Sequence, residues 1–353
     1  MAHIVVGLSG GVDSSVAAAL LVEEGADVSA VMLRLWAEPE ARGQGNLCCT
    51  SEAVARAQAV ADHLEIPFHL VDAREPFRQA VVEAFIAEYA AARTPNPCIV
   101  CNRDVRFPIL LDWMEQLGAD RLATGHYARL RRAAGGVQLL RGIDRRKDQS
   151  YVLHALGQEH LSRAFFPLGE LTKEAVRDIA ATRGLPVADQ PESQDICFVG
   201  DGDYRRFLAQ EAPETVQPGP ILDQAGQELG RHTGLVNYTI GQRKGIGLTA
   251  PQALYVLALD RERNALIVGP ASALGRETCT VAEMNYISGE VPSEPFRATA
   301  KIRYRHREVP VVATPLPEEQ LHVRFARPQR DVTPGQYLVL YSGEIVIGGG
   351  PIS

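Results

Sequence analysis

A pair of cysteines two residues apart is the first feature of the sequence that could do chemistry. Cys98 and Cys101 lie in the segment NPCIVCN, residues 96–102, behind an Asn-Pro pair that cannot extend a helix. A C-x-x-C pair can supply half of a zinc site, a redox couple, an anchor for an iron–sulfur cluster, or a thiol that attacks a substrate. The spacing leaves all four open, so the rest of the chain must decide.

The other four cysteines narrow these options only slightly. Cys48 and Cys49, together with the C-x-x-C pair, reach the four thiols of a structural zinc site, but adjacent cysteines rarely both reach one metal. Cys279 is most simply a core residue of a strand. Cys197 lies in the short apolar run of ESQDICFV, where a small buried core residue is the commonest fate of a lone cysteine.

The second chemical motif is SGGVDSS, residues 9–15, which follows an apolar run and opens an expected helix. Gly10 and Gly11 let the backbone approach a ligand closely, and Asp13 can cap the helix or hold Mg²⁺. With the positive end of the helix, the segment predicts a cradle for phosphate or pyrophosphate. It lacks the Gly-Lys-Ser/Thr of the Walker loop, which disfavours simple γ-phosphate chemistry. Further hydroxyls come from Ser9, Ser14 and Ser15.

Alternating strand and helix patterns predict how these motifs are positioned. Apolar runs typical of buried parallel strands alternate with segments of helical spacing, which predicts a doubly wound α/β sheet with ligands at the carboxyl ends of its strands. The expected strands are 3–8, 26–33, 68–73 and 121–125, and the expected helices are 13–24, 51–64, one ending at 89, and 107–117.

After about residue 200 the helical signals fade, and short β patterns separated by Gly/Pro turns follow. The segments 254–269 and 337–350 each predict a hairpin. We therefore expect three domains, an α/β domain at 1–202, a small β-rich domain at 203–275 and a mainly-β domain at 276–353.

Composition fits an ordinary globular protein of two or three domains, with 353 residues, 46% hydrophobic and 22% charged. No apolar run approaches the roughly 20 residues of a membrane span. The start, MAHIVVGLSGG, lacks the features of a signal peptide, so we expect a cytoplasmic protein with reduced thiols and no membrane partner.

The charge is unevenly distributed. The net charge is −7, yet residues 127–147 hold seven Lys/Arg and one acid, and residues 296–330 hold eight Lys/Arg and three acids. Within the second stretch AKIRYRHRE alternates, so that a strand there would place Lys301, Arg303, Arg305 and Arg307 on one face. A solvated outer face would normally mix signs, so these cations favour contact with a polyanion.

The motifs carry a resemblance. The SGG-x-DS loop resembles the pyrophosphatase-type loop of the adenine nucleotide α-hydrolase-like superfamily, whose members cleave ATP to AMP and pyrophosphate and so adenylate an oxygen. The whole chain resembles the tRNA-specific 2-thiouridylases, which replace an oxygen of the wobble uridine with sulfur, and the resemblance implies a β-barrel for the last domain. The matching segments are 94–107, 123–129, 147–153, 192–199, 237–247, 300–305 and 333–350.

The resemblance implies roles for two thiols. Thiolation needs a base oxygen made into a leaving group, a thiol that carries a persulfide, and a second thiol that releases the sulfur by forming a disulfide. The resemblance implies that Cys197 is the persulfide carrier and that Cys101 is the attacking thiol. A disulfide between them requires α-carbons within roughly 7 Å of each other.

The resemblance also implies binding residues. The implied ATP contacts are Gly7, Leu8, Ser9, Gly10, Gly11, Val12, Asp13, Ser14, Leu33 and Gly125. The implied target-base contacts are Asn96, Pro97 and Cys98. The implied tRNA contacts are His126, Lys147, Asp148, Gln149, Arg303, Tyr304 and Gln336. Three of these residues have alternative explanations: Leu33 as a core leucine, Gly125 as a turn glycine, and His126 as a core histidine or a contact to the target base.

Cys98 departs from the family pattern, because many members have Asp there with a proton-transfer role. A thiol of ordinary pKa about 8.5 is a poorer proton acceptor at neutral pH. Alternatively Cys98, Cys101 and Cys197 hold a [4Fe–4S] cluster with one iron open for sulfide.

Three functions remain at this point. The first is an ATP- and Mg²⁺-dependent tRNA thiolase, which acts as a monomer and receives sulfur from a cysteine desulfurase directly or through a relay protein. The second is an AMP-forming ligase acting on a small carboxylate, which leaves the basic stretches and the cysteines unused. The third is a non-catalytic RNA-binding protein with a metal at its C-x-x-C pair, which leaves the nucleotide loop unused.

Overall fold

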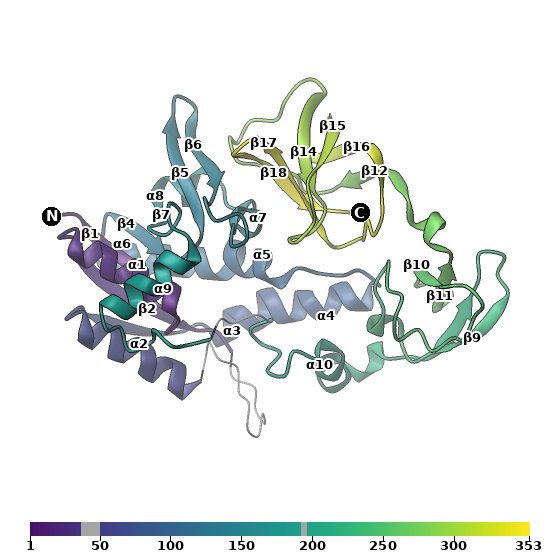
Figure 1. Ribbon diagram of the computed structural model, residues 1–353, viewed down its shortest axis with the longest axis horizontal. Helices are drawn as coiled ribbons and strands as arrows, with labels where there is room; N and C mark the ends of the chain where they lie inside the picture. Colours follow the sequence, from purple (N-terminus) through teal and green to yellow (C-terminus); the bar gives the residue numbers. More distant parts are fainter. Residues whose placement is uncertain (37–49, 192–195) are drawn as a thin grey trace.

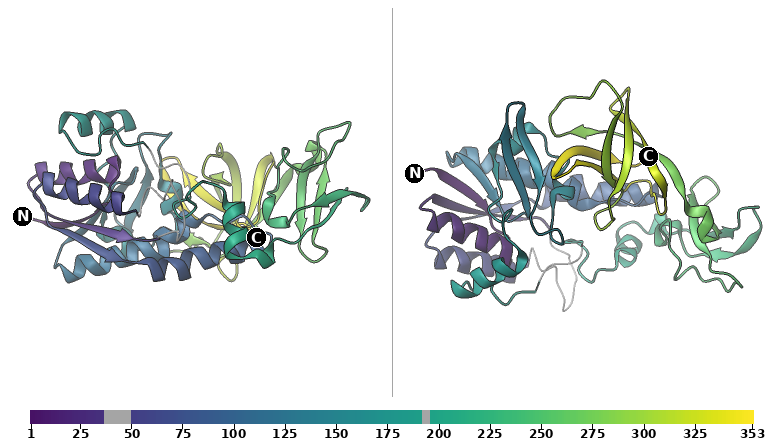
Figure 2. Two further views of the ribbon diagram at one scale, coloured as in Figure 1. Left: turned by 90° about the horizontal axis from the view of Figure 1, so that it is seen from below. Right: turned by 45° about the horizontal axis from the view of Figure 1, so that its top comes forward.

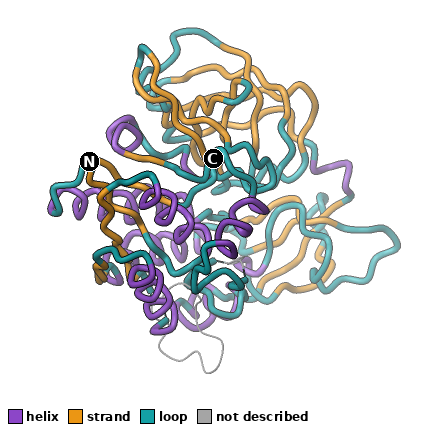
Figure 3. Tube along the Cα trace, turned by 60° about the vertical axis from the view of Figure 1, so that its left-hand side comes forward, coloured by secondary structure: helices purple, strands orange, loops and turns teal. Residues whose placement is uncertain are grey.

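A computed structural model describes residues 1–36, 50–191 and 196–353 (Figure 1). The strands form three sheets, and the helices gather around the first of them, as Figure 3 shows by colour. Cys48 and Cys49 lie outside the described residues.

The first sheet has five parallel strands in the order β3-β2-β1-β4-β7. Helices cover both of its faces, which is why the central strands β1 and β2 have buried, mainly apolar runs (Figure 2). Val5 faces one core cluster and its neighbour Val6 the other, as the alternation of side chains along a strand requires. The strands are β1 (His3–Gly7), β2 (Asp27–Arg34), β3 (Phe68–Asp72), β4 (Arg121–Thr124) and β7 (Ala164–Phe165).

The two faces are covered by different helices. One core cluster draws its buried side chains from α1 (Val12–Glu23), α2 (Ser51–His63) and α9 (Lys173–Thr182). The other draws them from the helical segments between Arg74 and Gln116. The doubly wound α/β sheet expected from the sequence is therefore confirmed.

Two long helices on the second face each contain a π-helical segment. Residues 74–90 form α3 (Arg74–Phe77), η1 (Arg78–Val82) and α4 (Glu83–Ala90). Residues 97–116 form α5 (Pro97–Cys101), η2 (Asn102–Arg106) and α6 (Phe107–Gln116).

The expected helix 107–117 is present as α6, but the helical segments that precede it from Pro97 were not expected. Asn96 is the N-cap residue and Pro97 the first helical residue, a position where proline is favoured because its missing N–H has no intrahelical partner. The C-x-x-C pair consequently lies in the first turns of a helix, immediately before a π-helical segment.

The second sheet has the order β10-β11-β8-β9 and includes the expected hairpin at 254–269. Its strands are β8 (Gly219–Leu222), β9 (Glu228–His232), β10 (Tyr255–Asp260) and β11 (Ala265–Gly269). The short helices outside the first sheet are α7 (Ser150–Leu153), α8 (Gln158–Arg163), α10 (Tyr204–Glu211), η3 (Pro213–Thr215), η4 (Leu235–Asn237) and η5 (Ala271–Leu274).

The third sheet contains the C-terminal strands and closes on itself through a bridge between Val281 and Ile352, which confirms a barrel. The expected hairpin at 337–350 is present, and a hairpin from the N-terminal part, β5 with β6, extends the sheet beyond β18. The strands are β12 (Arg276–Val281), β13 (Asn285–Tyr286), β14 (Phe296–Lys301), β15 (Val309–Leu316), β16 (Gln320–Gln329), β17 (Tyr337–Ser342), β18 (Ile345–Pro351), β5 (Ala128–Ala133) and β6 (Gly136–Arg141).

The expected strand through residues 300–308 was only partly right. β14 ends at Lys301, and a turn follows in which the backbone N–H of His306 donates to the carbonyl of Arg303 at 3.0 Å. Ile302 is nevertheless buried, and Arg303, Arg305 and Arg307 are exposed. Lys301 does not share this solvent side, because its side chain is largely buried beside Asp148. In the described ranges we find no helix with the length and hydrophobicity of a membrane span.

Candidate active site

The SGGVDSS loop follows β1, the strand at which the order of strand addition in the first sheet reverses. From β1 the chain builds β2 and β3 on one side, and it later returns to add β4 and β7 on the other. Such a switch point is the usual ligand site of a doubly wound sheet. The loop after β4 lies against the loop after β1: a Cβ on Gly125 would be 2.8 Å from the backbone nitrogen of Ser14. Glycine is required there by close approach of two backbones.

Glycine and serine fix the shape of the loop. Gly10 has a φ of +72°, and a Cβ on it would lie 2.6 Å from the carbonyl oxygen of Ala53 in α2. The Ser14 hydroxyl accepts from the N–H of Ser9 at 3.1 Å, and the Ser15 hydroxyl donates to the carbonyl of Gly11 at 2.8 Å. The hydroxyls thus brace the loop, and the start of α1 offers its N–H groups to an anion.

The Asp13 carboxylate is held by two side chains that the sequence motifs did not identify. The Lys173 ammonium lies 2.6 Å from Oδ1, and the Tyr127 hydroxyl donates to the same oxygen at 2.7 Å. Oδ2 makes no hydrogen bond or ion pair with the described residues, and the Asp13 side chain is 37% exposed. One oxygen therefore orients the carboxylate and the other is available to a cation.

Only one of these two residues had a signal in the sequence. Tyr127 lies in the ATGHYAR motif, two residues after Gly125. Lys173 opens α9, 160 residues after Asp13, and nothing in its local sequence marks it.

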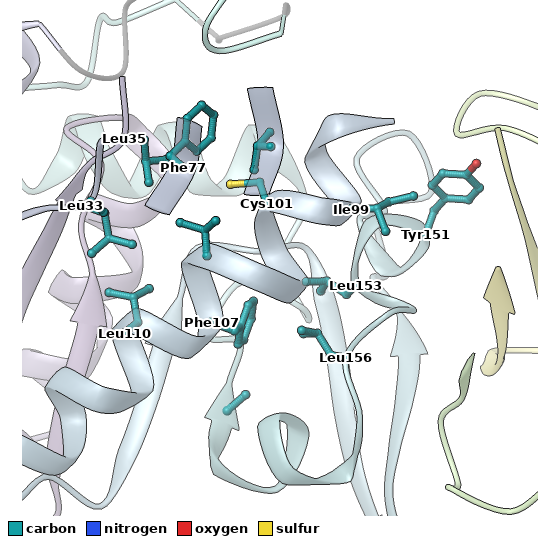
Figure 4. Packing of buried hydrophobic residues seen from close by; sticks show 14 of the residues in the cluster. Leu33, Leu35, Phe77, Ile99, Cys101, Phe107, Leu110, Tyr151, Leu153 and Leu156 are labelled. Atoms are coloured by element: carbon teal, nitrogen blue, oxygen red, sulfur yellow. The ribbon is translucent and has the colours of Figure 1, made fainter. Parts of the chain in front are cut away.

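The two thiols of the C-x-x-C pair have different environments. Cys98 is exposed, whereas Cys101 is buried among apolar residues. Figure 4 shows Cys101 between Ile99 on one side and Leu35 and Phe77 on the other.

Cys197 borders the same core cluster. It is half-buried and packs against the cluster that contains Cys101 and Leu33. Leu33, at the end of β2, is 9% exposed, as its alternative explanation as a core leucine requires. Both thiols therefore border the same apolar cluster, which also includes Leu33 at the end of β2, although 96 residues of sequence separate the cysteines.

The geometry does not fit an iron–sulfur cluster on Cys98, Cys101 and Cys197. Within the described ranges, no three His, Cys, Asp or Glu side chains are grouped closely enough to hold a metal ion. The three thiols also differ in exposure, with Cys98 exposed, Cys197 half-buried and Cys101 buried in the core.

The barrel contacts the segment that precedes the C-x-x-C pair. The Gln336 amide donates to the carbonyl of Thr94 at 3.0 Å, and the Thr94 N–H donates to the carbonyl of Pro334 at 2.9 Å. Burial raises the pKa of Tyr304 to about 12, with Asp148 and Cys98 contributing to the same direction. The structure thus brings Gln336 and Tyr304 beside the expected target-base segment.

Two of the expected tRNA contacts, Asp148 and Gln149, use their side chains within the protein. The side chain of Asp148 is 1% exposed and accepts from the N–H groups of Gly142 and Ser150 at 3.1 and 3.0 Å. The half-buried Gln149 uses its side-chain oxygen to accept from the Tyr127 N–H at 2.9 Å. The Asp148 side chain therefore has almost no surface for a ligand.

His126 is a core histidine. It is buried, stacks on Phe107 and shares a 2.8 Å hydrogen bond with the Thr124 hydroxyl. Burial, helped by the charge of Arg106, lowers its pKa to about 3, so the ring is neutral at physiological pH. Of the remaining expected contacts, Arg303 is exposed beside Asp331 at 3.5 Å, and Lys147 is half-buried.

Three family models match the chain in succession. They are described as the tRNA methyl transferase HUP domain (residues 2–201), the tRNA methyl transferase PRC-barrel domain (205–270) and the aminomethyltransferase beta-barrel domain (276–352). Among solved structures, the U34-tRNA thiolase NcsA from Methanococcus maripaludis with its [4Fe-4S] cluster has 19% identity and a TM-score of 0.35, covering 60% of this chain and 68% of that one. A likeness this weak carries no argument about function.

Curated relatives match over the full length. The chain is 49% identical to the tRNA-specific 2-thiouridylase MnmA of Roseiflexus castenholzii, covering 100% of both chains, and 49% identical to that of Chloroflexus aurantiacus, covering 100% of this chain and 99% of the relative. The MnmA of Magnetococcus marinus is 47% identical, with 99% and 98% covered. The chain belongs to the family of the tRNA-specific 2-thiouridylases.

Proposed function

We propose that this protein is an ATP-dependent sulfurtransferase that converts the wobble uridine of tRNA to 2-thiouridine. The observation that supports the proposal is that Cys101, Cys197 and Leu33 at the end of β2 share one apolar cluster, while the loop after the neighbouring strand β1 forms the phosphate cradle. An AMP-forming ligase for a small acid has no use for these thiols, and a non-catalytic RNA-binding protein has none for the cradle.

The cradle binds the phosphates of ATP. The N–H groups at the start of α1 and the loop backbone from Gly7 to Ser14 surround the pyrophosphate, and Leu33 and Gly125 border the adenosine. Mg²⁺ enters with ATP and prefers carboxylate and phosphate oxygens, which makes Oδ2 of Asp13 its protein ligand. Lys173 and Tyr127 orient that carboxylate through Oδ1.

The target base lies against Asn96, Pro97 and Cys98. A uridine that undergoes this chemistry must leave its stack, and Tyr304 and Gln336 of the barrel adjoin this segment. Lys147 and Arg303 supply positive charge for the phosphates of the same tRNA.

The reaction has three covalent steps. The base oxygen attacks the α-phosphorus of ATP and releases pyrophosphate. The terminal sulfur of a persulfide on Cys197 then attacks the base carbon and expels AMP. Finally the Cys101 thiolate attacks the Cys197 sulfur, which releases the thiolated base and leaves a Cys101–Cys197 disulfide that an external dithiol reduces. A cysteine desulfurase, directly or through a relay protein, reloads Cys197.

The three segments divide this work. Residues 1–202 hold ATP and the thiols, residues 276–353 contact tRNA beside the target base, and residues 203–275 connect the two. We assign the enzyme to the cytoplasm, where tRNA and ATP are available, and expect a monomer.

A nucleoside assay tests the proposal. The protein is incubated with tRNA, ATP, Mg²⁺ and a persulfide donor, and the tRNA is digested and analysed for thiouridine. Cys197→Ser and Cys101→Ser should each abolish repeated turnover. Cys279→Ser is the matched control: Cys279 packs in the barrel, where burial raises its pKa to about 12, and its loss should leave the rate unchanged. Thiouridine formed at the wild-type rate by Cys197→Ser would refute the mechanism.

A further inference from the structure

One motif of the chain has no part in this mechanism, the segment NYTIGQRKGIG at residues 237–247. It contains the adjacent cations Arg243 and Lys244, both exposed. Residues 229–259 contain no Asp or Glu, although the chain as a whole has a net charge of −7. The two cations therefore have no acid near them in sequence.

The turn that presents these cations is braced from within. The side-chain oxygen of Gln242 accepts from the N–H of Thr239 at 3.2 Å, and its amide donates to the carbonyl of Lys244 at 2.9 Å. The backbone of Gly241 and Gln242 is also bonded to Val256 of β10 at 2.8 and 2.9 Å. A pre-ordered turn loses little conformational entropy when it binds a ligand.

Glycines leave the far side of the turn open. Gly245 and Gly247 have φ values of +76° and +82°, and a Cβ on Gly247 would meet no atom within 4 Å. The backbone there is accessible to a large partner.

The turn adjoins the proposed tRNA face of the barrel. A Cβ on Gly241 would lie 2.0 Å from Oδ1 of Asp331, and Oδ2 of Asp331 is 3.5 Å from the Arg303 guanidinium. The guanidinium of Arg330 lies over the ring of Tyr255, at the start of β10, 5.2 Å from its centroid. The turn and the start of β10 thus contact the barrel beside two of its cations, Arg303 and Arg330.

We propose that the turn Thr239–Gly245 is a second tRNA-binding site, at which Arg243 and Lys244 contact backbone phosphates of the same tRNA that Arg303 binds. The inference rests on the proposed function, since it takes tRNA as the polyanion. Phosphate contacts of this kind hold the register of the RNA and carry no sequence information. Arg243 and Lys244 are exposed on a braced turn with no acid near them in sequence, and the carboxylate that reaches the turn at Gly241, that of Asp331, already faces Arg303.

The test is the affinity of the full-length protein for an unmodified tRNA transcript, measured by fluorescence anisotropy from low to high salt. The double variant Arg243→Ala/Lys244→Ala should bind at least tenfold more weakly at about 0.1 M salt. The slope of log affinity against log salt should fall by about 1 to 2, since each phosphate contact contributes roughly 0.7 to 0.9.

The matched control removes two cations elsewhere in the same sheet. Arg261 and Arg263 are exposed in the turn after Asp260, at the opposite end of β10 from Tyr255. Arg261→Ala/Arg263→Ala should change the affinity and the slope much less. Unfolding midpoints of both variants verify that each is folded.

The possible failures are distinguishable. If the wild-type protein binds and thiolates tRNA and the two double variants behave alike, the second site is refuted and the proposed function stands. If the wild-type protein neither binds nor thiolates tRNA, the proposed function itself fails.

Discussion

Two lysine–aspartate pairs in this protein use the same chemistry in opposite settings. In the cradle, the Lys173 ammonium lies 2.6 Å from Asp13, whose side chain is 37% exposed. At the junction with the barrel, the Lys301 ammonium lies 3.9 Å from Asp148, whose side chain is 1% exposed. The first pair leaves one carboxylate oxygen to solvent, and the second is sealed between two parts of the chain.

The junction pair belongs to a buried charged cluster. Arg141 lies 3.6 Å over the ring of Tyr341, pairs with Glu308 at 2.6 Å and reaches Asp148 at 3.9 Å. Burial lowers the pKa of Lys301, a sign of how strongly this site disfavours charge. Buried charges recover their desolvation cost only when they are well paired. The cluster therefore specifies how the barrel docks more than it adds net stability, whereas the cradle pair prepares a site for a ligand.

The largest expected effect is on catalysis at the cradle. Asp13→Asn keeps an acceptor for Lys173 and Tyr127 but removes the negative charge offered to Mg²⁺. The rate of thiouridine formation should fall about 10³-fold, while the free energy of unfolding changes by less than about 1 kcal/mol. A rate within tenfold of the wild type would show that the exposed oxygen is not used.

At the junction the larger effect should be on stability. Asp148→Ala removes the buried acceptor of Arg141 and Lys301 and should lower the free energy of unfolding by about 3 kcal/mol in urea titrations. The thiolation rate per folded molecule should fall less than tenfold. The double variant Asp148→Ala/Lys301→Met should recover part of the lost stability, because it removes a charge left without its partner. Failure of the double variant to recover would contradict the account of the cluster.

Acid should weaken both regions, since each contains a buried neutral histidine. Burial lowers the pKa of His126, near the cradle, to about 3 and that of His154, near Tyr337 of the barrel, to about 4. Below pH 6.5 these two histidines bind protons in the unfolded chain but stay neutral in the folded chain. The stability that they contribute is therefore present above pH 6.5 and is lost as the pH falls.

Between pH 7.5 and 5.5 the expected loss from these two histidines is about 2 to 3 kcal/mol, because one pH unit per proton is worth about 1.4 kcal/mol. Urea unfolding at several pH values measures it. His154→Gln should remove about half of this dependence, and an unchanged pH profile would contradict the assignment.

The smallest expected effect is at the edge of the junction cluster. Glu308 is one-third exposed, pairs with Arg141 and accepts from the Thr299 hydroxyl at 2.8 Å. Glu308→Gln keeps an acceptor for Arg141, reverses the direction of the hydrogen bond with Thr299 and loses a partly screened charge, so it should cost about 1 kcal/mol. A loss as large as that of Asp148→Ala would mean that the cluster depends on Glu308 as much as on the buried carboxylate.

The sequence predicted what local patterns determine. The parallel strands, the hairpins at 254–269 and 337–350 and the position of the cradle follow from apolar runs and glycine turns, and the structure has them. The helix start at Pro97 was missed because proline was taken only as a helix breaker. The turn after Lys301 was missed because alternation of buried and exposed side chains does not require a strand.

The sites were harder to predict because their contacts are distant in sequence. Lys173 contacts Asp13 although 160 residues separate them in sequence, and no local pattern predicts such a pair. Asp148 was expected at the tRNA surface because it lies beside a basic stretch and matches a family motif. Its carboxylate is instead buried, where it accepts from the N–H groups of the nearby residues Gly142 and Ser150. Charge patterns locate a surface but do not determine which side chain of a segment faces it.

The pairing of β6 with β18 also bears on how the chain is made. Ile345 pairs with Leu140, and the N–H of Arg141 donates to the carbonyl of Glu344 at 3.0 Å, so an N-terminal hairpin completes a C-terminal sheet. During synthesis the ribosome releases residue 141 about 200 residues before its partner, and the edge of β6 stays unpaired for that interval. Unpaired edges of this kind attract other chains. The hairpin that later joins the N-terminal domain to the barrel is therefore a point at which the nascent chain is open to aggregation.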